Sequence, residues 1–204
     1  MPNSPIHPGA VAWTGENPGI YLKDTQDGPW TGLMTFFRIT WSEHGRGHGV
    51  LLLDEPNVEQ GPPEVANFCI TDNAALARYL VDTFFANFAS FKVSPGLKSI
   101  QYLPLTEVYR EGDTRSTYSE VVKSADQEVR MTWKGLSAPY AVDMPPEKGP
   151  TQVHEMYSLF LDASDASVTV NGRPLKGKVV ERDFADTKKS TAFLAFSESW
   201  MTAR

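Results

Sequence analysis

The sequence predicts a mainly β fold, a β-barrel or barrel-like antiparallel sandwich, with one substantial α-helix at about residues 73–91. After residue 98 the chain divides into short segments rich in β-branched and aromatic residues, separated by turn formers, as in antiparallel sheets. Asn171-Gly172, between two such segments, is the strongest hairpin sequence in the chain. Residues 73–91 combine a helical period with a capping sequence. An α+β fold is the alternative.

The chain is expected to form one domain, residues 1–204, because no repeat, low-complexity tract or long linker divides it. Its two proline-rich segments, at 54–64 and 144–150, have the length of loops. Hydrophobic residues make up 41% of the chain, which is enough for a sizeable core.

The strands are predicted from alternating apolar and polar residues and from the turn formers between them. Before the helix we expect strands at 32–41, 50–53 and 65–70, with short edge strands at 11–13 and 20–22 inside a turn-rich lead-in at about 1–29. After the helix we expect strands at 100–110, 114–123, 128–134, 140–143, 153–161, 167–170, 175–182 and 191–200. Pro104 should place the first of these later strands at an edge or a bulge.

The helix prediction depends on a cap and a repeating apolar stripe. Thr71-Asp72-Asn73 offers side-chain oxygens that can cap the first turn. Leu76, Leu80, Phe84 and Phe88 then recur every fourth residue, and Pro95-Gly96 ends the segment. So apolar a helix should pack against the sheet or close one end of a barrel.

Composition excludes several classes of function. The net charge is −6, and Lys188-Lys189 is the densest basic cluster, so nucleic-acid binding is not expected. Cys69 is the one cysteine, which excludes a disulfide within the chain and fits a reducing compartment. No signal-peptide pattern opens the sequence, and residues 74–91 are too short and too polar to span a membrane. We therefore expect a cytoplasmic protein without membrane contact.

His44 and His48 form the most metal-like pattern in the chain. Two histidines four residues apart share one face of a helix, but three glycines interleave this segment, so no helix is expected. A hairpin tip could still bring the two imidazoles together, with Glu43 completing a site. The alternative is a mobile polar loop.

His154 is the candidate catalytic residue. It lies in a predicted strand and shares a face with Met156, Ser158 and Phe160, whereas Glu155 points to the opposite face. In a cavity, an imidazole in this position could contact a ligand or transfer a proton near neutral pH. The alternative is a core histidine with a satisfied hydrogen bond.

Further ligand-binding candidates come from other strands. Arg38 alternates with apolar residues and could anchor a carboxylate if it faced the interior, although an arginine facing water is the commoner case. Trp41, Tyr102, Tyr118 and Trp133 could line a cavity, or could be ordinary core residues.

The turn Gly28-Pro29-Trp30 leads into a predicted strand and is similar to the Gly-x-Trp that opens the first barrel strand of lipocalins. The resemblance covers three residues and implies a calycin-like barrel. The motif follows a turn-rich lead-in, and the helix at 73–91 is not where lipocalins keep theirs. No functional residue is therefore carried over.

Together these observations favour binding of a small apolar or aromatic molecule inside a β-barrel, with no cofactor because no phosphate-binding or cofactor motif is present. Whether the protein also catalyses a cofactor-independent acid–base step, of isomerase, cyclase or decarboxylase type, is left open. The alternatives are a non-catalytic homodimeric interaction protein and a metal-binding β protein that uses His44 and His48.

Overall fold

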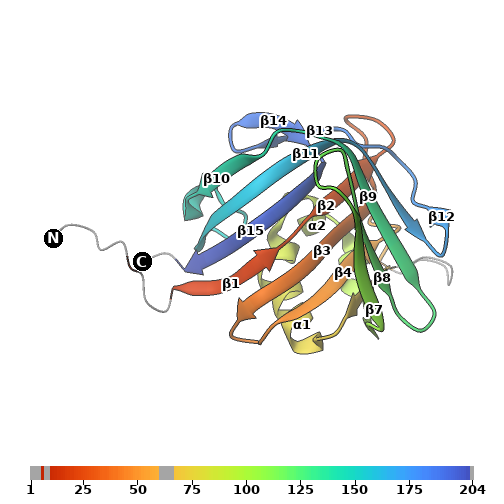
Figure 1. Ribbon diagram of the computed structural model, residues 1–204, viewed down its shortest axis with the longest axis horizontal. Coiled ribbons are helices and arrows are strands. Elements are labelled where there is room, and N and C mark those ends of the chain that lie inside the picture. The colour runs from red at the N-terminus through yellow and green to blue at the C-terminus, as the bar shows by residue number, and fades with distance from the viewer. Residues whose placement is uncertain (1–5, 7–9, 60–66, 203–204) are drawn as a thin grey trace.

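A computed structural model describes residues 6, 10–59 and 67–202 (Figure 1). The strands are β1 (Val11–Glu16), β2 (Gly19–Lys23), β3 (Trp30–Ser42), β4 (Gly47–Leu53), β5 (Asn67–Thr71), β6 (Gln101–Pro104), β7 (Glu107–Gly112), β8 (Thr117–Lys123), β9 (Glu128–Leu136), β10 (Tyr140–Met144), β11 (His154–Val170), β12 (Arg173–Pro174), β13 (Glu181–Phe184), β14 (Thr187–Ser190) and β15 (Ala192–Thr202). The helical elements are α1 (Ala74–Thr83), η1 (Phe85–Asn87), α2 (Ala89–Lys92), η2 (Pro95–Ser99) and η3 (Pro146–Lys148).

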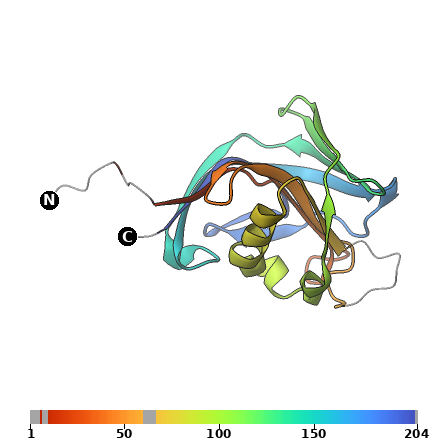
Figure 2. The same ribbon diagram turned by 90° about the horizontal axis from the view of Figure 1, so that it is seen from below.

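Within the described residues, thirteen strands form one sheet, in the order β6-β5-β4-β3-β1-β15-β11-β9-β8-β7, with β2, β10 and β12 paired beside this path. β13 and β14 form a separate hairpin. Figure 2 shows the sheet as an arch, with the helices in its concavity. The predicted mainly β fold with a barrel-like sandwich and one substantial helix is confirmed.

The N-terminal strands are central, not edge strands as the sequence indicated. β1 and β2 both pair with β3 on one side and with β15 on the other. The break between them falls at Asn17-Pro18, where proline has no N–H to donate. The strand line continues because Asn17 donates to the carbonyl of Ala195, and the carbonyl of Pro18 accepts from Phe36.

Two apolar cores lie on opposite faces of the central strands. Neighbouring residues of β3 divide between them, with Leu33 and Phe37 on one face and Met34 and Phe36 on the other. The helix-side core lies between the sheet and the helical segment and includes Trp13, Tyr21, Phe37, Leu80, Phe84, Phe85, Met144, Met156, Phe160, Phe193 and Trp200. The sheet-side core includes Ile20, Met34, Phe36, Val50, Leu52, Tyr118, Val129, Met131, Trp133, Val168 and Leu194.

The helix begins as the sequence predicts, with the Asn73 side chain accepting from the backbone N–H of Leu76 at 3.1 Å. It does not continue to residue 91, because α1 ends at Thr83 and two shorter helical elements follow. Phe84 and Phe85 are both fully buried. Adjacent residues of a regular helix point about 100° apart, so the interruption lets both rings enter the core.

Several strand boundaries also differ from the expectation. The two strands expected at 153–161 and 167–170 are one continuous strand, β11, and the strand expected at 175–182 is largely irregular until β13 begins at Glu181. β6 pairs with β5 in parallel, an exception to the antiparallel pattern. Trp30 of the lipocalin-like motif opens the third strand of the chain and not the first. Residues 65–66 of an expected strand lie outside the described residues.

Candidate functional site

The predicted ligand-binding residues do not form one site. Tyr118 and Trp133 lie in the sheet-side core, with ring centroids 6.0 Å apart. His154 lies on the other side of the sheet, against Phe84 of the helix-side core. Trp41 is 49% exposed, and Tyr102 is half-buried beneath the guanidinium of Arg78, 4.1 Å from its ring centroid.

Arg38 is neutralised within the protein. Its Nη2 donates to both carboxylate oxygens of Glu120, at 2.9 and 3.0 Å, and its Nη1 donates to Glu16. Tyr118 donates its hydroxyl to the same Glu120 at 2.5 Å. Burial alone would lower the pKa of Arg38, but the two carboxylates raise it. Anchoring of an external carboxylate by Arg38 stays a prediction, and its donors already face two protein carboxylates.

Two irregularities lie near each other in the sheet, where Gly15 of β1 pairs with Glu198 of β15. The register of β1 against β3 shifts between Thr14 and Gly15, and a Cβ on Gly15 would lie 2.1 Å from the carbonyl oxygen of Arg38. The register of β15 against β11 also shifts, and Ser197 there has a positive φ of 55°. Such bulges redirect side chains. Glu198, next to Ser197, is only 3% exposed.

Glu198 is a buried acid without a direct cationic partner among the described residues. The indole N–H of Trp200 donates to its Oε1 at 2.6 Å, and the amide of Asn17 does so at 3.4 Å. Thr35 in turn donates to the amide oxygen of Asn17. Burial raises the pKa of Glu198 to about 7, although these hydrogen bonds and the more distant Arg182 act to lower it. The group can therefore exchange a proton near neutral pH.

Tyr21 and Arg182 are the other ionisable groups of this region, and we call Tyr21, Arg182 and Glu198 the interior cluster. The three interact electrostatically with one another. Burial raises the pKa of Tyr21 to about 12. The guanidinium of Arg182 lies 4.1 Å from the ring centroid of Phe193 and 5.9 Å from that of Tyr21. A few polar groups thus meet in an otherwise apolar core.

His154 lies in the same core, and the predicted face it shares with Met156, Ser158 and Phe160 is buried. Its Nδ1 is 3.1 Å from the hydroxyl of Thr151, and burial lowers its pKa. Trp200 connects it to the interior cluster, because the Trp200 ring packs 6.4 Å from His154 and its N–H reaches Glu198.

His44 and His48 have separate partners. The His44 ring lies 4.3 Å from the ring of Tyr79, and the His48 Nδ1 lies 2.9 Å from the carboxylate of Asp72. In the described part of the chain, no group of three or more His, Cys, Asp or Glu side chains is arranged to hold a metal ion. The metal-binding alternative stays a prediction, and within the described residues His44 and His48 each contact a different side chain.

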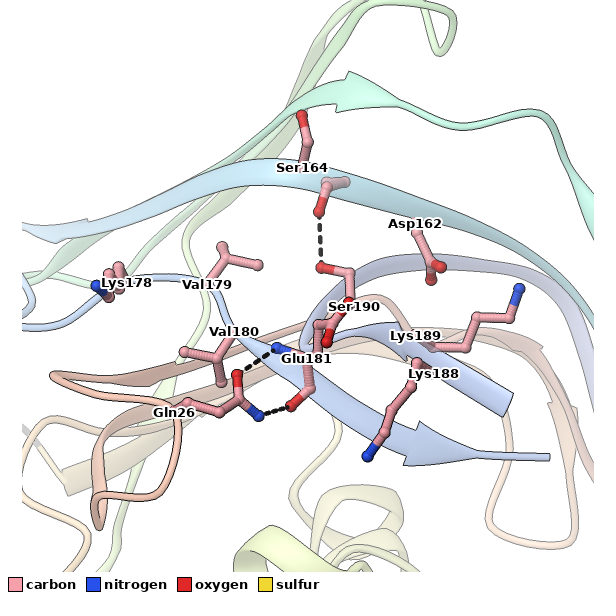
Figure 3. Close-up of a pocket in the computed structure, with 11 residues that line it drawn as sticks. Gln26, Asp162, Ser164, Lys178, Val179, Val180, Glu181, Lys188, Lys189 and Ser190 are labelled. Carbon is pink, nitrogen blue, oxygen red and sulfur yellow. Dashed lines mark hydrogen bonds between the residues drawn. The ribbon is translucent and has the colours of Figure 1, made fainter. Parts of the chain in front are cut away.

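A groove of about 570 Å³ lies beside the β13–β14 hairpin. It is lined by Gln26, Asp162, Ala163, Ser164, Lys178, Val179, Val180, Glu181, Lys188, Lys189 and Ser190. Figure 3 shows that the amino groups of its three lysines point away from one another, so they do not converge on a common anion. Ser190 connects this hairpin groove to the interior cluster, because its carbonyl accepts from Nε of Arg182 at 3.1 Å.

Comparisons with protein-family models, curated proteins and solved structures gave no match. The lipocalin resemblance therefore depends on three residues alone. No helix within the described residues is long and apolar enough to cross a membrane.

Sequence reasoning missed the interior cluster. The sequence holds one indication of a buried acid, because Glu198 lies two residues before Trp200 and therefore on the apolar face of a predicted strand. Arg182 had a weaker signal of the same kind, two residues before Phe184.

Proposed function

We propose that the protein binds a small apolar or aromatic molecule in the helix-side core, beside the interior cluster. The observation that carries this proposal is the meeting of Tyr21, Arg182 and Glu198 among buried aromatic rings. Binding sites for small molecules are mostly apolar, with a few polar groups that orient the ligand, and perturbed pKa values concentrate at such sites.

The position of the β13–β14 hairpin supports entry of a ligand to the helix-side core from one end of the sheet. Figure 1 places the β13–β14 hairpin at one end of the arch, and the hairpin is not part of the main sheet. The side chain of Ser190 donates to the carbonyl of Ala163 at 2.6 Å, and that of Gln26 bonds to the backbone of Glu181. A few exchangeable hydrogen bonds of this kind open at lower cost than a ladder of paired strands.

An acid–base role for His154 belongs to the same proposal. Burial lowers its pKa, so its neutral form can accept a proton at physiological pH, and Glu198 titrates in the same range. Two groups whose environments move their pKa values in opposite directions are typical of acid–base pairs. Replacing His154 with Gln should then abolish turnover of a bound ligand while leaving its affinity within about threefold, because only the proton transfer is lost.

The binding proposal is tested by a thermal-shift screen of neutral aromatic and alicyclic compounds, followed by calorimetric titration of the hits. A ligand that binds the native state raises the melting temperature. Tyr21→Phe should weaken a hit severalfold, whereas the matched Tyr118→Phe, in the sheet-side core, should not. An absence of hits from the screen, or equal effects of the two substitutions, would count against the helix-side core as the binding site.

A homodimer is the second candidate, and one observation favours it. Trp41 pairs with Thr14, Thr14 with Ser199, and Ser199 with Tyr157, so Trp41 and Tyr157 share one face of the sheet. They are 49% and 38% exposed, and Leu159, also 38% exposed, lies two residues from Tyr157 on the same strand face. Sedimentation of the wild type and of Trp41→Ser tests this candidate. A monomeric wild type at high micromolar concentration would exclude it.

We also propose a cytoplasmic location. The support is Cys69, which is free and fully buried and therefore fits a reducing compartment. Localisation of a tagged chain by cell fractionation tests this proposal.

A further inference from the structure

Arg182 is a charged side chain whose hydrogen-bonding capacity is largely unused. Its Nε donates to the carbonyl of Ser190 at 3.1 Å. Its Nη2 is shielded from solvent and has no hydrogen-bond partner among the described residues. None of the ion pairs within that part of the chain includes Arg182. A guanidinium carries five N–H donors, so most of the Arg182 donors make no hydrogen bond within the described residues.

The contrast with Arg38 is informative. Arg38 contacts two carboxylates, and its pKa is raised. The pKa of Arg182 is lowered, because burial outweighs the attraction of more distant groups such as Tyr21 and Asp162. Both side chains are partly buried, but of the two only Arg38 contacts a counter-ion in the described part of the chain.

Aromatic rings, not carboxylates, surround the Arg182 guanidinium. Its Cζ lies 4.1 Å from the ring centroid of Phe193, 4.7 Å from that of Phe184 and 5.9 Å from that of Tyr21. Contact with ring faces partly compensates a desolvated cation. It does not satisfy the N–H donors, and Nη2 stays without a hydrogen-bond partner among the described residues.

We propose that Arg182 binds the carboxylate of a small aromatic or apolar monocarboxylic acid, whose ring or chain packs against Phe184, Phe193 and Tyr21. This inference rests on the proposed function and names its ligand class. Arginine matches a carboxylate with two parallel hydrogen bonds, and such charge-assisted pairs are strong in a buried site. The hairpin groove adjoins this position, since Ser190 lines the groove and bonds to Arg182.

The neighbouring acids restrict the charge of the ligand. Asp162 accepts from the hydroxyl of Tyr140 at 2.9 Å and, like Glu198, interacts electrostatically with Arg182. A dianion such as a phosphate monoester would be repelled by both acids and would meet a single guanidinium. A monocarboxylate carries one charge and exposes an apolar body to the aromatic rings, which suits this site better.

The experiment compares pairs of ligands that differ only in charge. A panel of aromatic and aliphatic monocarboxylates, with phenylacetate among them, is titrated by calorimetry beside the corresponding primary amides. The proteins are the wild type, Arg182→Met, and Arg130→Met as a matched control, because Arg130 pairs with Glu111 at the surface. We expect the wild type and Arg130→Met to prefer carboxylates to amides at least tenfold, and Arg182→Met to lose that preference.

The outcomes separate the two proposals. If amides and carboxylates bind the wild type equally well at the helix-side core, the role of Arg182 is wrong and the proposed function stands. If Arg182→Met retains the carboxylate preference, the anchor lies elsewhere and the inference is likewise overturned. If no member of either series binds the wild type, the inference is overturned, and the screen of neutral compounds decides the proposed function separately. The wild-type comparison needs no variant, so a folding defect in Arg182→Met leaves the test decisive.

Discussion

The indole N–H of Trp200, a residue of the helix-side core, donates to the buried carboxyl of Glu198 at 2.6 Å. Both side chains project from β15 beside a bulge at which Ser197 takes a positive φ of 55°. Among the described residues this carboxyl receives hydrogen bonds but contacts no cation, and burial raises its pKa to about 7. Its protonation is therefore linked to the stability of the fold.

Replacing Glu198 with Gln should flatten the pH dependence of stability. The folded carboxyl keeps its proton above the ordinary pKa of 4.5, so between pH 4.5 and 7 the folded state binds more protons than the unfolded state. Stability of the wild type should then fall as pH rises through this window, by about 3 kcal/mol relative to the variant. Urea denaturation at a series of pH values measures this difference. Parallel curves for the two proteins would show that Glu198 titrates normally.

Replacement of Arg38 and of Arg182 with Met should have different effects on the free energy of unfolding. Arg38→Met leaves Glu120 buried without a counter-ion and should lower the free energy of unfolding by about 3–5 kcal/mol. Arg182→Met removes an unpaired cation and should change stability by less than about 1 kcal/mol, or increase it.

Denaturant titration of both variants, with Arg130→Met as the surface control, checks this contrast. The control should stay within about 1 kcal/mol of the wild type, because its ion pair with Glu111 is exposed. A large loss of stability in Arg182→Met would identify Arg182 as a structural residue and weaken its assignment to a ligand.

Gly15 should not tolerate a methyl group. A Cβ there would lie 2.1 Å from a backbone oxygen of the neighbouring strand, so Gly15→Ala should cost at least about 3 kcal/mol. Gly172→Ala is the matched comparison, because its φ is +79° but no atom lies within 4 Å of the added carbon. That substitution should cost only about 1–2 kcal/mol of backbone strain. Thermal or urea unfolding gives both values, and equal costs would contradict the packing argument.

His154 should titrate at lower pH than an ordinary histidine. Burial disfavours its charged form, so its pKa lies below 6.5 in the folded state. The unfolded chain then binds more protons below that pH, and the contribution of His154 to stability is lost as the solution is acidified. An NMR titration of the ring protons should give a midpoint below 6.5, and a higher midpoint would mean that the ring is solvated.

The fold class followed from the sequence because strand alternation and turn residues are local signals. The clean alternation at 128–134 became β9, and Asn171-Gly172 forms the turn between β11 and β12. The placement of β1 and β2 did not follow, because a strand flanked by turns looks alike at the edge and at the centre of a sheet. The end of the helix at Thr83 could not be predicted either, because the burial of both Phe84 and Phe85 depends on the sheet that they contact.

The site was less predictable, because its members are distant in sequence. Tyr21, Arg182 and Glu198 meet through strand pairing and through bulges, neither of which the alternation pattern encodes. The sequence allowed Arg38 as an interior anchor, with a water-facing side chain as the commoner alternative, and its partner Glu120, which neutralises it, lies on a different strand. For His154 the sequence indicated which residues share its strand face, because this is a local property of one strand, and the structure shows that the face is buried.

The methyl groups of the methionines give the most direct test of ligand binding in the helix-side core. Met144 and Met156 belong to this core, whereas Met34 and Met131 belong to the sheet-side core. In methyl NMR spectra recorded during titration with a hit compound, the signals of Met144 and Met156 should shift and saturate, while those of Met34 and Met131 stay in place. Saturable shifts confined to Met34 and Met131, or to neither pair, would contradict the account.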